Sequence, residues 1–297
     1  MIFSYYPMNL DLLYLVPLYF GNDIIPKYIH FSFALLTAWL IFDYLRNRLG
    51  SVYALFGFIF FVSIPIIIKL SISVYVDLGL IFFSTASLLL LLRWLDSGFA
   101  LKYFFPAAIF CGLAMGTKYN GLIVFFLLSL FVPFISSRYT GKSSVDIFRV
   151  MGQGTLFFCV ALLIFSPWMI RNYIWTGNPI YPLYNQFFIG NEGAAMSSVS
   201  LFAYREVLYG ESWWQMALLP VRIFFQGRDG NPQYFDGTLN PFLLLLPFFS
   251  FYQIKKDSHI IKTEKKILLA FAVLFFAFAF FSSGLRIRYI SPIIPPL

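Results

Sequence analysis

The sequence predicts an all-α fold, a polytopic bundle of transmembrane helices, and three observations support this. Of the 297 residues, 60% are hydrophobic and 11% are charged, whereas soluble domains contain about 25% charged residues. The apolar residues form runs of roughly 20, the length that crosses a bilayer as a helix. Short polar and basic connections separate these runs. The chain is therefore an integral membrane protein.

About eight spans are expected from the apolar runs. They cover residues 28–46, 52–72, 77–95, 103–117, 120–136, 150–169, 239–254 and 267–284. The fourth and seventh are short. Residues 8–20 are too short to span and contain Pro17. We expect a shallow helix there, on the same side as the start of the third span.

The orientation follows from the Lys and Arg residues, because short cytoplasmic loops accumulate them. The predicted cytoplasmic side holds Arg46, Arg48, Arg93, Lys102, Arg138, Lys142, Arg149, Lys255, Lys256, Lys262, Lys265 and Lys266. The other side holds fewer, and four of those lie in one long segment. Topology thus accounts for the net charge of +8, and no nucleic-acid partner is implied.

That long segment divides the chain. Residues 1–170 form the N-terminal part of the transmembrane module, residues 171–238 an extracytoplasmic loop, and residues 239–297 further spans. The loop contains Trp175, Trp213, Trp214 and many Tyr residues, which argues against disorder. We expect short interfacial helices in it.

Two carboxylates lie in or beside apolar segments. Asp77 stands at the start of the third span, in "SISVYVDLGLIFF", and Asp11 lies in the shallow helix. A charge within a bilayer is costly and is a functional candidate by default. The alternatives are a favoured helix N-terminus for Asp77 and a solvated interfacial charge for Asp11. We treat both as candidate catalytic residues.

Lys118 lies in "GLAMGTKYNGL", a polar break between two spans. A cation there either meets lipid headgroups without specificity or holds a specific phosphate. Gly116 and Gly121 would let the backbone approach a ligand closely. Lys118 and the neighbouring Tyr119 are candidate substrate-binding residues.

Arg171 follows the sixth span and precedes a rigid turn in "RNYIWTGNPIYPL". Interfacial snorkelling is the simpler explanation. A rigid turn also suits a positioned guanidinium, which binds phosphate oxygens bidentately. Arg171, Asn178 of the turn and Arg288 near the C-terminus complete the candidate substrate-binding residues.

The charged candidates map to one predicted membrane face. The span count places Asp11, Asp77, Lys118, Arg171 and Arg288 on the extracytoplasmic side. We expect Asp77, Lys118 and Arg171 to open onto one cavity that the loop helices cap.

Several other site types find no support. His30 and His259 are predicted on opposite faces, and no Cys/His spacing resembles a zinc site. The sequence has no P-loop, GxGxxG or GxSxG motif. Cys111 and Cys159 both lie in apolar runs, where a buried hydrophobic role is usual.

The order of several motifs resembles the GT-C class of membrane glycosyltransferases. The chain is most similar to the bacterial branch related to dolichyl-phosphate-mannose-protein mannosyltransferases and aminoarabinose transferases. The similarity rests on "YYPMNLDLLYL", "PKYIHFSFALLTAWLIFDYLRNRLG", "YVDLGLIFFSTASLLLLLRWL", "GLAMGTKYNGL", "PWMIRNYIWTGNPIYPL" and "RYISPIIPPL", in that order.

This resemblance implies an activity and a location. Such enzymes transfer a sugar from a polyprenyl-phosphate carrier to a glycan, lipid or protein acceptor, at the extracytoplasmic face of the bacterial inner membrane. Asp77 matches an acidic position at the start of a later span, and Asp11 matches one at the end of the first external loop. Lys118 and Arg171 would stabilise the leaving phosphate, a role that a divalent metal ion can also fill.

The chain departs from this class at both ends. A first span, a first acidic loop and further C-terminal spans are expected but not seen, so we expect a truncated chain. The alternative functions are a lipid-linked-sugar transporter or flippase without chemistry, a polysaccharide polymerase or ligase, and a structural membrane subunit. A transporter predicts mid-span polar residues and inverted repeats, and the sequence shows neither.

Overall fold

The computed structural model describes residues 2–139, 147–189, 200–252, 258–280 and 285–297. Within these residues every regular element is an α-helix or a 3-10 helix, which confirms the all-α prediction. Lys142, Lys255, Lys256 and the last residues of the predicted spans 239–254 and 267–284 lie outside the described residues.

Contacts divide the chain into two compact units. Unit 1 contains residues 1–16 and 86–198, and unit 2 contains residues 17–85 and 199–297. Helix α5 (Asp77–Asp96) contributes its first residues to unit 2 and the rest to unit 1. Helix α1 (Asn9–Tyr19) is divided the other way round, with its residues up to Val16 in unit 1 and the last three in unit 2.

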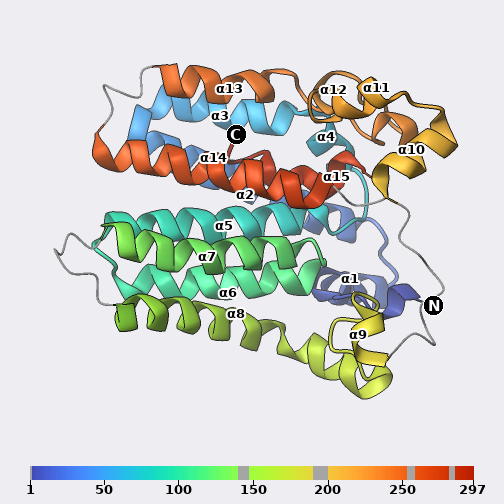
Figure 1. Ribbon diagram of the computed structural model, residues 1–297, viewed down its shortest axis with the longest axis horizontal. Coiled ribbons are helices and arrows are strands. Elements are labelled where there is room, and N and C mark those ends of the chain that lie inside the picture. Colours follow the sequence, from blue (N-terminus) through green and yellow to red (C-terminus); the bar gives the residue numbers. More distant parts are fainter. Residues whose placement is uncertain (1, 140–146, 190–199, 253–257, 281–284) are drawn as a thin grey trace. The chain divides into compact units, whose positions relative to one another are not determined.

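Unit 1 is built on three helices that pack against one another, α6 (Leu101–Thr117), α7 (Gly121–Tyr139) and α8 (Ile147–Thr176) (Figure 1). Glycines permit their close approach: a Cβ added to Gly112 would lie 2.6 Å from the carbonyl oxygen of Ala161. Phe104 and Phe157 meet edge to face in the core, with centroids 5.9 Å apart. The unit also contains η1 (Ile2–Tyr5) and α9 (Asn185–Ile189).

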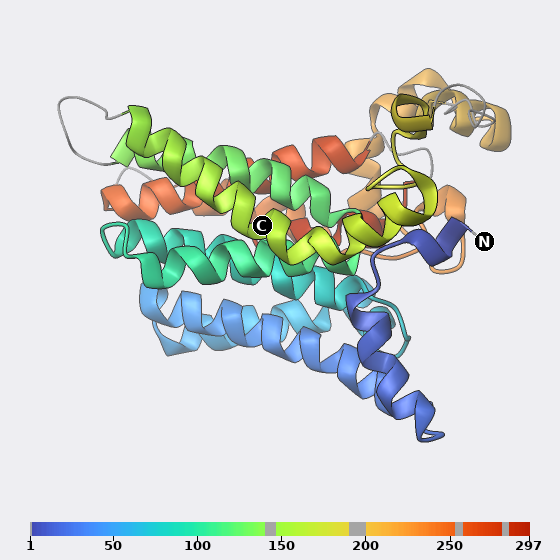
Figure 2. The same cartoon turned by 90° about the horizontal axis from the view of Figure 1, so that it is seen from below.

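Unit 2 begins with α2 (Ile25–Leu49), which lies alongside α3 (Ser51–Ser63) and contacts α4 (Pro65–Ser71) (Figure 2). Its C-terminal part is a series of mostly short helices, in which α14 contacts α13, α15 and η5. These are α10 (Leu201–Tyr209), α11 (Trp213–Ala217), α12 (Leu219–Phe225), η3 (Pro232–Tyr234), α13 (Phe242–Tyr252), α14 (His259–Phe280), α15 (Ile287–Ile290) and η5 (Ser291–Ile293).

A helix lies at the position of each predicted span, but fewer helices have the length and apolarity to cross a bilayer. Among the described residues there are 4, namely α2, α5, α7 and α8, or up to 5 if α3 and α4 form one bent span. Helices α6 and α13 are apolar but shorter. Charged residues at the start of α14 lower its apolarity, since Lys262, Glu264, Lys265 and Lys266 all fall within it.

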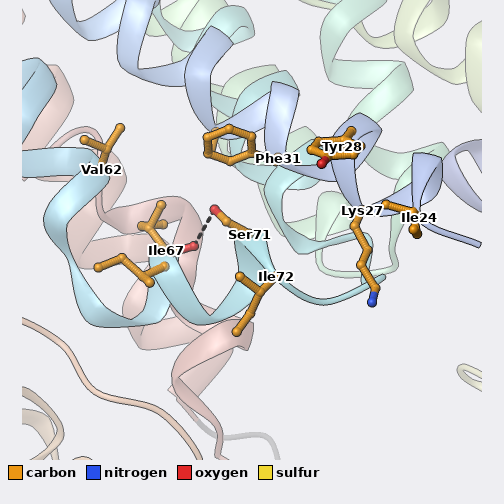
Figure 3. Close-up of a pocket in the computed structure, with 10 residues that line it drawn as sticks. Ile24, Lys27, Tyr28, Phe31, Val62, Ile67, Ser71 and Ile72 are labelled. Atoms are coloured by element: carbon orange, nitrogen blue, oxygen red, sulfur yellow. Dashed lines mark hydrogen bonds between the residues drawn. The ribbon is translucent and has the colours of Figure 1, made fainter.

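The second predicted span is broken rather than straight, with α3 and α4 bent by 64°. Ile64, the residue before Pro65, is extended at φ −64°, ψ 126°, as the proline ring disfavours the helical conformation of its predecessor. A groove of about 510 Å³ opens between α2 and the bend. Figure 3 shows Tyr28 and Phe31 facing Val62, Ile67 and Ile72 across it, with Lys27 at one end.

Candidate functional site

The structure distributes the predicted site residues between the two units. Unit 1 contains Asp11, Lys118, Tyr119, Arg171 and Asn178, and unit 2 contains Asp77 and Arg288. The expectation that Asp77, Lys118 and Arg171 line one cavity stays a prediction.

Arg171 lies between two indole rings of its own helix. Trp168, Arg171 and Trp175 are three and four residues apart, a spacing that places them on one face of α8. The guanidinium carbon is 4.6 Å from the Trp168 ring centroid and 5.3 Å from that of Trp175. Both distances suit cation–π attraction, which holds the cation in place.

The hydrogen bonds of Arg171 go to neutral oxygens. Its Nε and Nη2 donate to Asn172 Oδ1 at 3.3 and 3.1 Å, and Nη2 also donates to the Tyr6 carbonyl at 3.1 Å. No carboxylate forms an ion pair with Arg171 within the described part of the chain. The guanidinium is thus positioned while its charge is not neutralised locally, as an anion-binding group requires.

Asn172 and Tyr119 connect Arg171 to the rest of unit 1. Asn172 is buried, and its Nδ2 donates to the Tyr5 carbonyl at 2.9 Å and to Tyr119 Oη at 3.1 Å. Tyr119 Oη donates in turn to the Tyr181 carbonyl at 2.6 Å. Burial raises the pKa of Tyr119 to about 12, so the phenol keeps the proton that it donates. Tyr119 therefore helps to fix the position of Asn172, to which Arg171 donates.

Asn178 has both ends of its amide committed to its own loop. Its side chain is fully buried, Oδ1 accepts from the backbone N–H of Ile180 at 2.9 Å, and Nδ2 donates to the Leu183 carbonyl at 2.9 Å. Gly177 precedes it at φ +72°, a left-handed conformation that ends α8. These contacts favour a turn-forming role for Asn178 over direct substrate contact.

Lys118 and Asp11 occupy helix ends in unit 1. Lys118 caps the C-terminus of α6, where its extended backbone donates from N–H to the Ala114 carbonyl at 3.3 Å. Asp11 lies in the first turn of α1. Partial burial raises the pKa of its carboxyl, against a backbone hydrogen bond that lowers it, although the residue as a whole is exposed. Such a carboxyl accepts a proton more readily than an ordinary aspartate.

Asp77 is the first residue of α5 and only 1% of it is exposed. The neighbouring Leu78 N–H donates to His30 Nε2 at 3.0 Å. His30 Nδ1 lies 3.0 Å from the Leu70 carbonyl and 2.9 Å from that of Ser73. Because Nδ1 faces two acceptors and Nε2 faces a donor, these partners assign the neutral tautomer with the proton on Nδ1. His30 thereby ties the end of α4 to the start of α5.

Arg288 is the electrostatic partner of Asp77. Its guanidinium carbon lies 4.7 Å from the Tyr75 ring centroid and 5.3 Å from that of Tyr289. Burial opposes its charge, but the Asp77 carboxylate and the two tyrosines outweigh this and raise the pKa of Arg288. Its Nε is buried and has no hydrogen-bond partner among the residues that the structure describes. A buried unpaired donor is costly, and a ligand oxygen would satisfy it.

Sequence reasoning found the charged residues but missed their neutral partners. Asn172, His30 and the carbonyls of Tyr5 and Tyr6 all support a predicted residue. The one available signal was the spacing of Trp168, Arg171 and Trp175. The described residues contain no group of three His, Cys, Asp or Glu that could hold a metal ion.

Comparison with known proteins identifies the family. The sequence model of dolichyl-phosphate-mannose-protein mannosyltransferases matches residues 20–170, which are 151 of the 297 residues. This range contains Asp77, Lys118 and Tyr119 and ends next to Arg171. No curated protein and no solved structure matches the chain significantly. The match over half of the chain confirms the resemblance to GT-C enzymes, and the protein belongs to the dolichyl-phosphate-mannose-protein mannosyltransferase family of membrane glycosyltransferases.

Proposed function

We propose that the protein transfers a sugar from a polyprenyl-phosphate donor to an acceptor at the extracytoplasmic face of the membrane. Membership of the family supports transfer of a lipid-linked sugar. The positive-inside distribution of Lys and Arg supports the extracytoplasmic face. The acceptor is a hydroxyl of a glycan, lipid or protein.

In this reaction one bond forms and one breaks. The acceptor oxygen bonds to the anomeric carbon of the sugar, while the bond from that carbon to the phosphate oxygen breaks. Asp77 takes the proton of the acceptor hydroxyl, with Asp11 as the second candidate for this role. The phosphate leaves with negative charge, which Arg288, in the same unit as Asp77, stabilises. Arg171 and Lys118 of unit 1 are further candidate cations for binding the donor.

The observation that carries this proposal is the burial of Asp77 at the start of a membrane helix, within the field of Arg288. A buried carboxylate is retained at a membrane helix end mainly for function. The helix dipole explains how the position tolerates a charge. It does not explain why the buried Arg288 Nε has no hydrogen-bond partner among the described residues.

Asp77→Asn tests the proposal. In proteoliposomes supplied with a polyprenyl-phosphate-mannose donor and an acceptor, we expect kcat to fall by about 10²- to 10⁴-fold, since a positioned base is removed. Donor affinity should change little. Asp96→Asn, the same change at the exposed end of the same helix, should retain activity. Full activity of Asp77→Asn would refute Asp77 as the base, and Asp11→Asn would then test the second candidate.

A further inference from the structure

Three charged side chains form a buried cluster in unit 2 that the proposed reaction does not use. Arg205, Glu211 and Arg222 are only 2%, 4% and 9% exposed. Arg205 donates from Nε and Nη2 to the two Glu211 oxygens at 2.6 and 2.8 Å. Arg222 Nη2 donates to Glu211 Oε1 at 3.0 Å. The arginines outnumber the carboxylate, so the cluster is more than a neutral ion pair.

Two further hydrogen bonds of the cluster reach the backbone of neighbouring segments. Arg222 Nη1 donates to the Gln215 carbonyl at 2.7 Å, and Arg205 Nη2 donates to the Gln233 carbonyl at 2.6 Å. Buried ion pairs often add no stability beyond that of apolar residues of equal volume. A cluster bonded in this way does fix where the connected segments lie.

Residues 226–238, which we name the docking loop, continue from this cluster. The Arg205 guanidinium carbon lies 5.1 Å from the ring centroid of Phe235, which is fully buried. Phe235 and Asp236 have left-handed φ values of +67° and +43°. Non-glycine residues hold such values only where their surroundings impose them. The cluster therefore helps to shape the docking loop at Phe235.

The docking loop in turn holds α15. The Phe235 carbonyl accepts from the Ile287 backbone N–H at 2.9 Å. Asp236 Oδ2 lies 3.5 Å from Arg286 Nη1, and Asp236 Oδ1 is 2.9 Å from Lys69 Nζ. Gly237 fits closely, because an added Cβ would lie 3.2 Å from Ile287 Cβ.

Helix α15 cannot position its side chains alone, because a helix of four residues is far too short to be stable by itself. Arg288 follows Ile287 directly. Its direction therefore depends on the segments that hold α15, which are the docking loop, through Arg286 and Ile287, and α14.

We propose that Arg205, Glu211 and Arg222 are positioning residues that act through Phe235, Asp236 and Ile287 to aim Arg288 at the donor phosphate. This inference rests on the proposed function, which gives Arg288 the phosphate as its ligand. It adds that the arginines and the glutamate of this segment serve the reaction although they touch no substrate.

Glu211→Gln in the full chain tests the inference, with Glu264→Gln as the matched control. Glu264 is also buried and paired with an arginine, Arg48, but belongs to α14 rather than to the docking loop. We expect Glu211→Gln to weaken binding of a polyprenyl-phosphate-mannose donor by about 10- to 100-fold, the effect of misplacing a binding group. Glu211→Asp should restore part of this loss. Glu264→Gln should lower the melting temperature comparably and leave donor affinity unchanged.

Hydrogen exchange supplies a readout that needs no donor. Glu211→Gln should accelerate exchange of the Ile287 amide, whereas Glu264→Gln should not. If both variants leave residues 285–290 equally protected, the cluster only stabilises the fold and the inference is wrong. If Glu211→Gln does not fold, Arg205→Lys takes its place, because Lys keeps the charge but cannot bond Glu211 and Gln233 together.

The two proposals fail in different ways. A wild-type protein that binds no donor refutes the proposed function, while the exchange of Ile287 still decides whether the cluster holds α15. A wild-type protein that binds donor, with Glu211→Gln unchanged in both affinity and exchange, refutes the positioning role alone.

Discussion

Arg171 shows how its neighbours limit what a single cation can do. The sequence predicts a bidentate contact with phosphate, which needs two adjacent N–H groups. In the structure Nε and Nη2 already donate to Asn172 and to the Tyr6 carbonyl. The Nη1 atom makes no hydrogen bond within the described residues. A phosphate oxygen would therefore meet Nη1, and a second contact would have to displace the Tyr6 carbonyl.

Arg171→Ala should weaken donor binding by about 10- to 100-fold, because a hydrogen bond to a charged group contributes roughly 1.5 to 3 kcal/mol. Arg171→Lys should also weaken it, since the donors of an ammonium all sit on one nitrogen and cannot reproduce the planar fork that reaches Asn172, Tyr6 and a phosphate from separate nitrogens. Affinity for a polyprenyl-phosphate sugar in nanodiscs measures both effects.

Arg149→Ala, at the opposite end of the same helix, is the control and should bind normally. Wild-type affinity in Arg171→Ala would make Arg171 an interfacial anchor. Full recovery in Arg171→Lys would mean that a simple positive charge suffices.

For individual residues, the sequence predicts which charged side chains are functional candidates better than it predicts the groups that contact them. Asp77 and Arg171 are conspicuous because charge within an apolar run is costly. The Asn172 side chain bonds Tyr5, 167 residues away in the chain. His30 similarly reaches Ser73 and Leu78. No linear pattern indicates such pairs, since they depend on how the helices fold back.

Among the elements, α6 shows how small residues permit close packing. Membrane helices pack closely where Gly, Ala and Ser let their backbones approach. Helix α6 carries Gly112 against α8 and Gly116 against Asn9, whose Nδ2 would lie 2.1 Å from an added Cβ. The Trp168 indole donates to the same Asn9 at 2.8 Å. Gly116 on α6 therefore leaves room for Asn9, which accepts from Trp168, the residue whose ring lies beside Arg171.

Gly112→Val should lower the melting temperature of the detergent-solubilised protein, because its Cβ would lie 2.6 Å from the carbonyl oxygen of Ala161. Overpacking of this kind costs about 1 to 3 kcal/mol. Gly152→Val is the control on α8, where an added Cβ meets nothing within 4 Å. Equal melting temperatures for the two variants would contradict a packing role for Gly112.

The sequence predicts the existence of the elements well and their breaks less well. Apolar runs locate the helices because the bilayer imposes both length and composition. The break of the second span at Ile64 was not predicted, although Pro65 is a physical reason for it. The short helices α10 to α12 lie in the predicted loop, but their polar partners only become evident in three dimensions.

At the scale of the whole molecule, two ion pairs of unit 2 agree with the predicted sidedness. Arg48 pairs with Glu264, and the span count places both beside cytoplasmic connections. Lys69 pairs with Asp236, and both are predicted on the other side. These pairs join segments far apart in the sequence. An error of one span between two partners would have placed them at opposite membrane faces.

Cysteine labelling tests the orientation itself. After Cys111 and Cys159 are replaced by Ala, Trp213→Cys in the exposed loop should react with a membrane-impermeant maleimide in intact cells. Asn47→Cys, between the first two predicted spans, should react only after permeabilisation, since positive connections stay cytoplasmic. The reverse pattern would place the site residues on the cytoplasmic face.

The pairing of Arg48 with Glu264 also constrains the order of biosynthesis. The two residues are 216 positions apart, and a ribosome adds about 5 to 20 residues per second. Roughly 10 to 45 s therefore pass between the synthesis of Arg48 and that of Glu264. During that time the predicted topology would leave Arg48 at the cytoplasmic headgroups without Glu264. The ion pair can form only after α14 has been synthesised, late in the assembly of the protein.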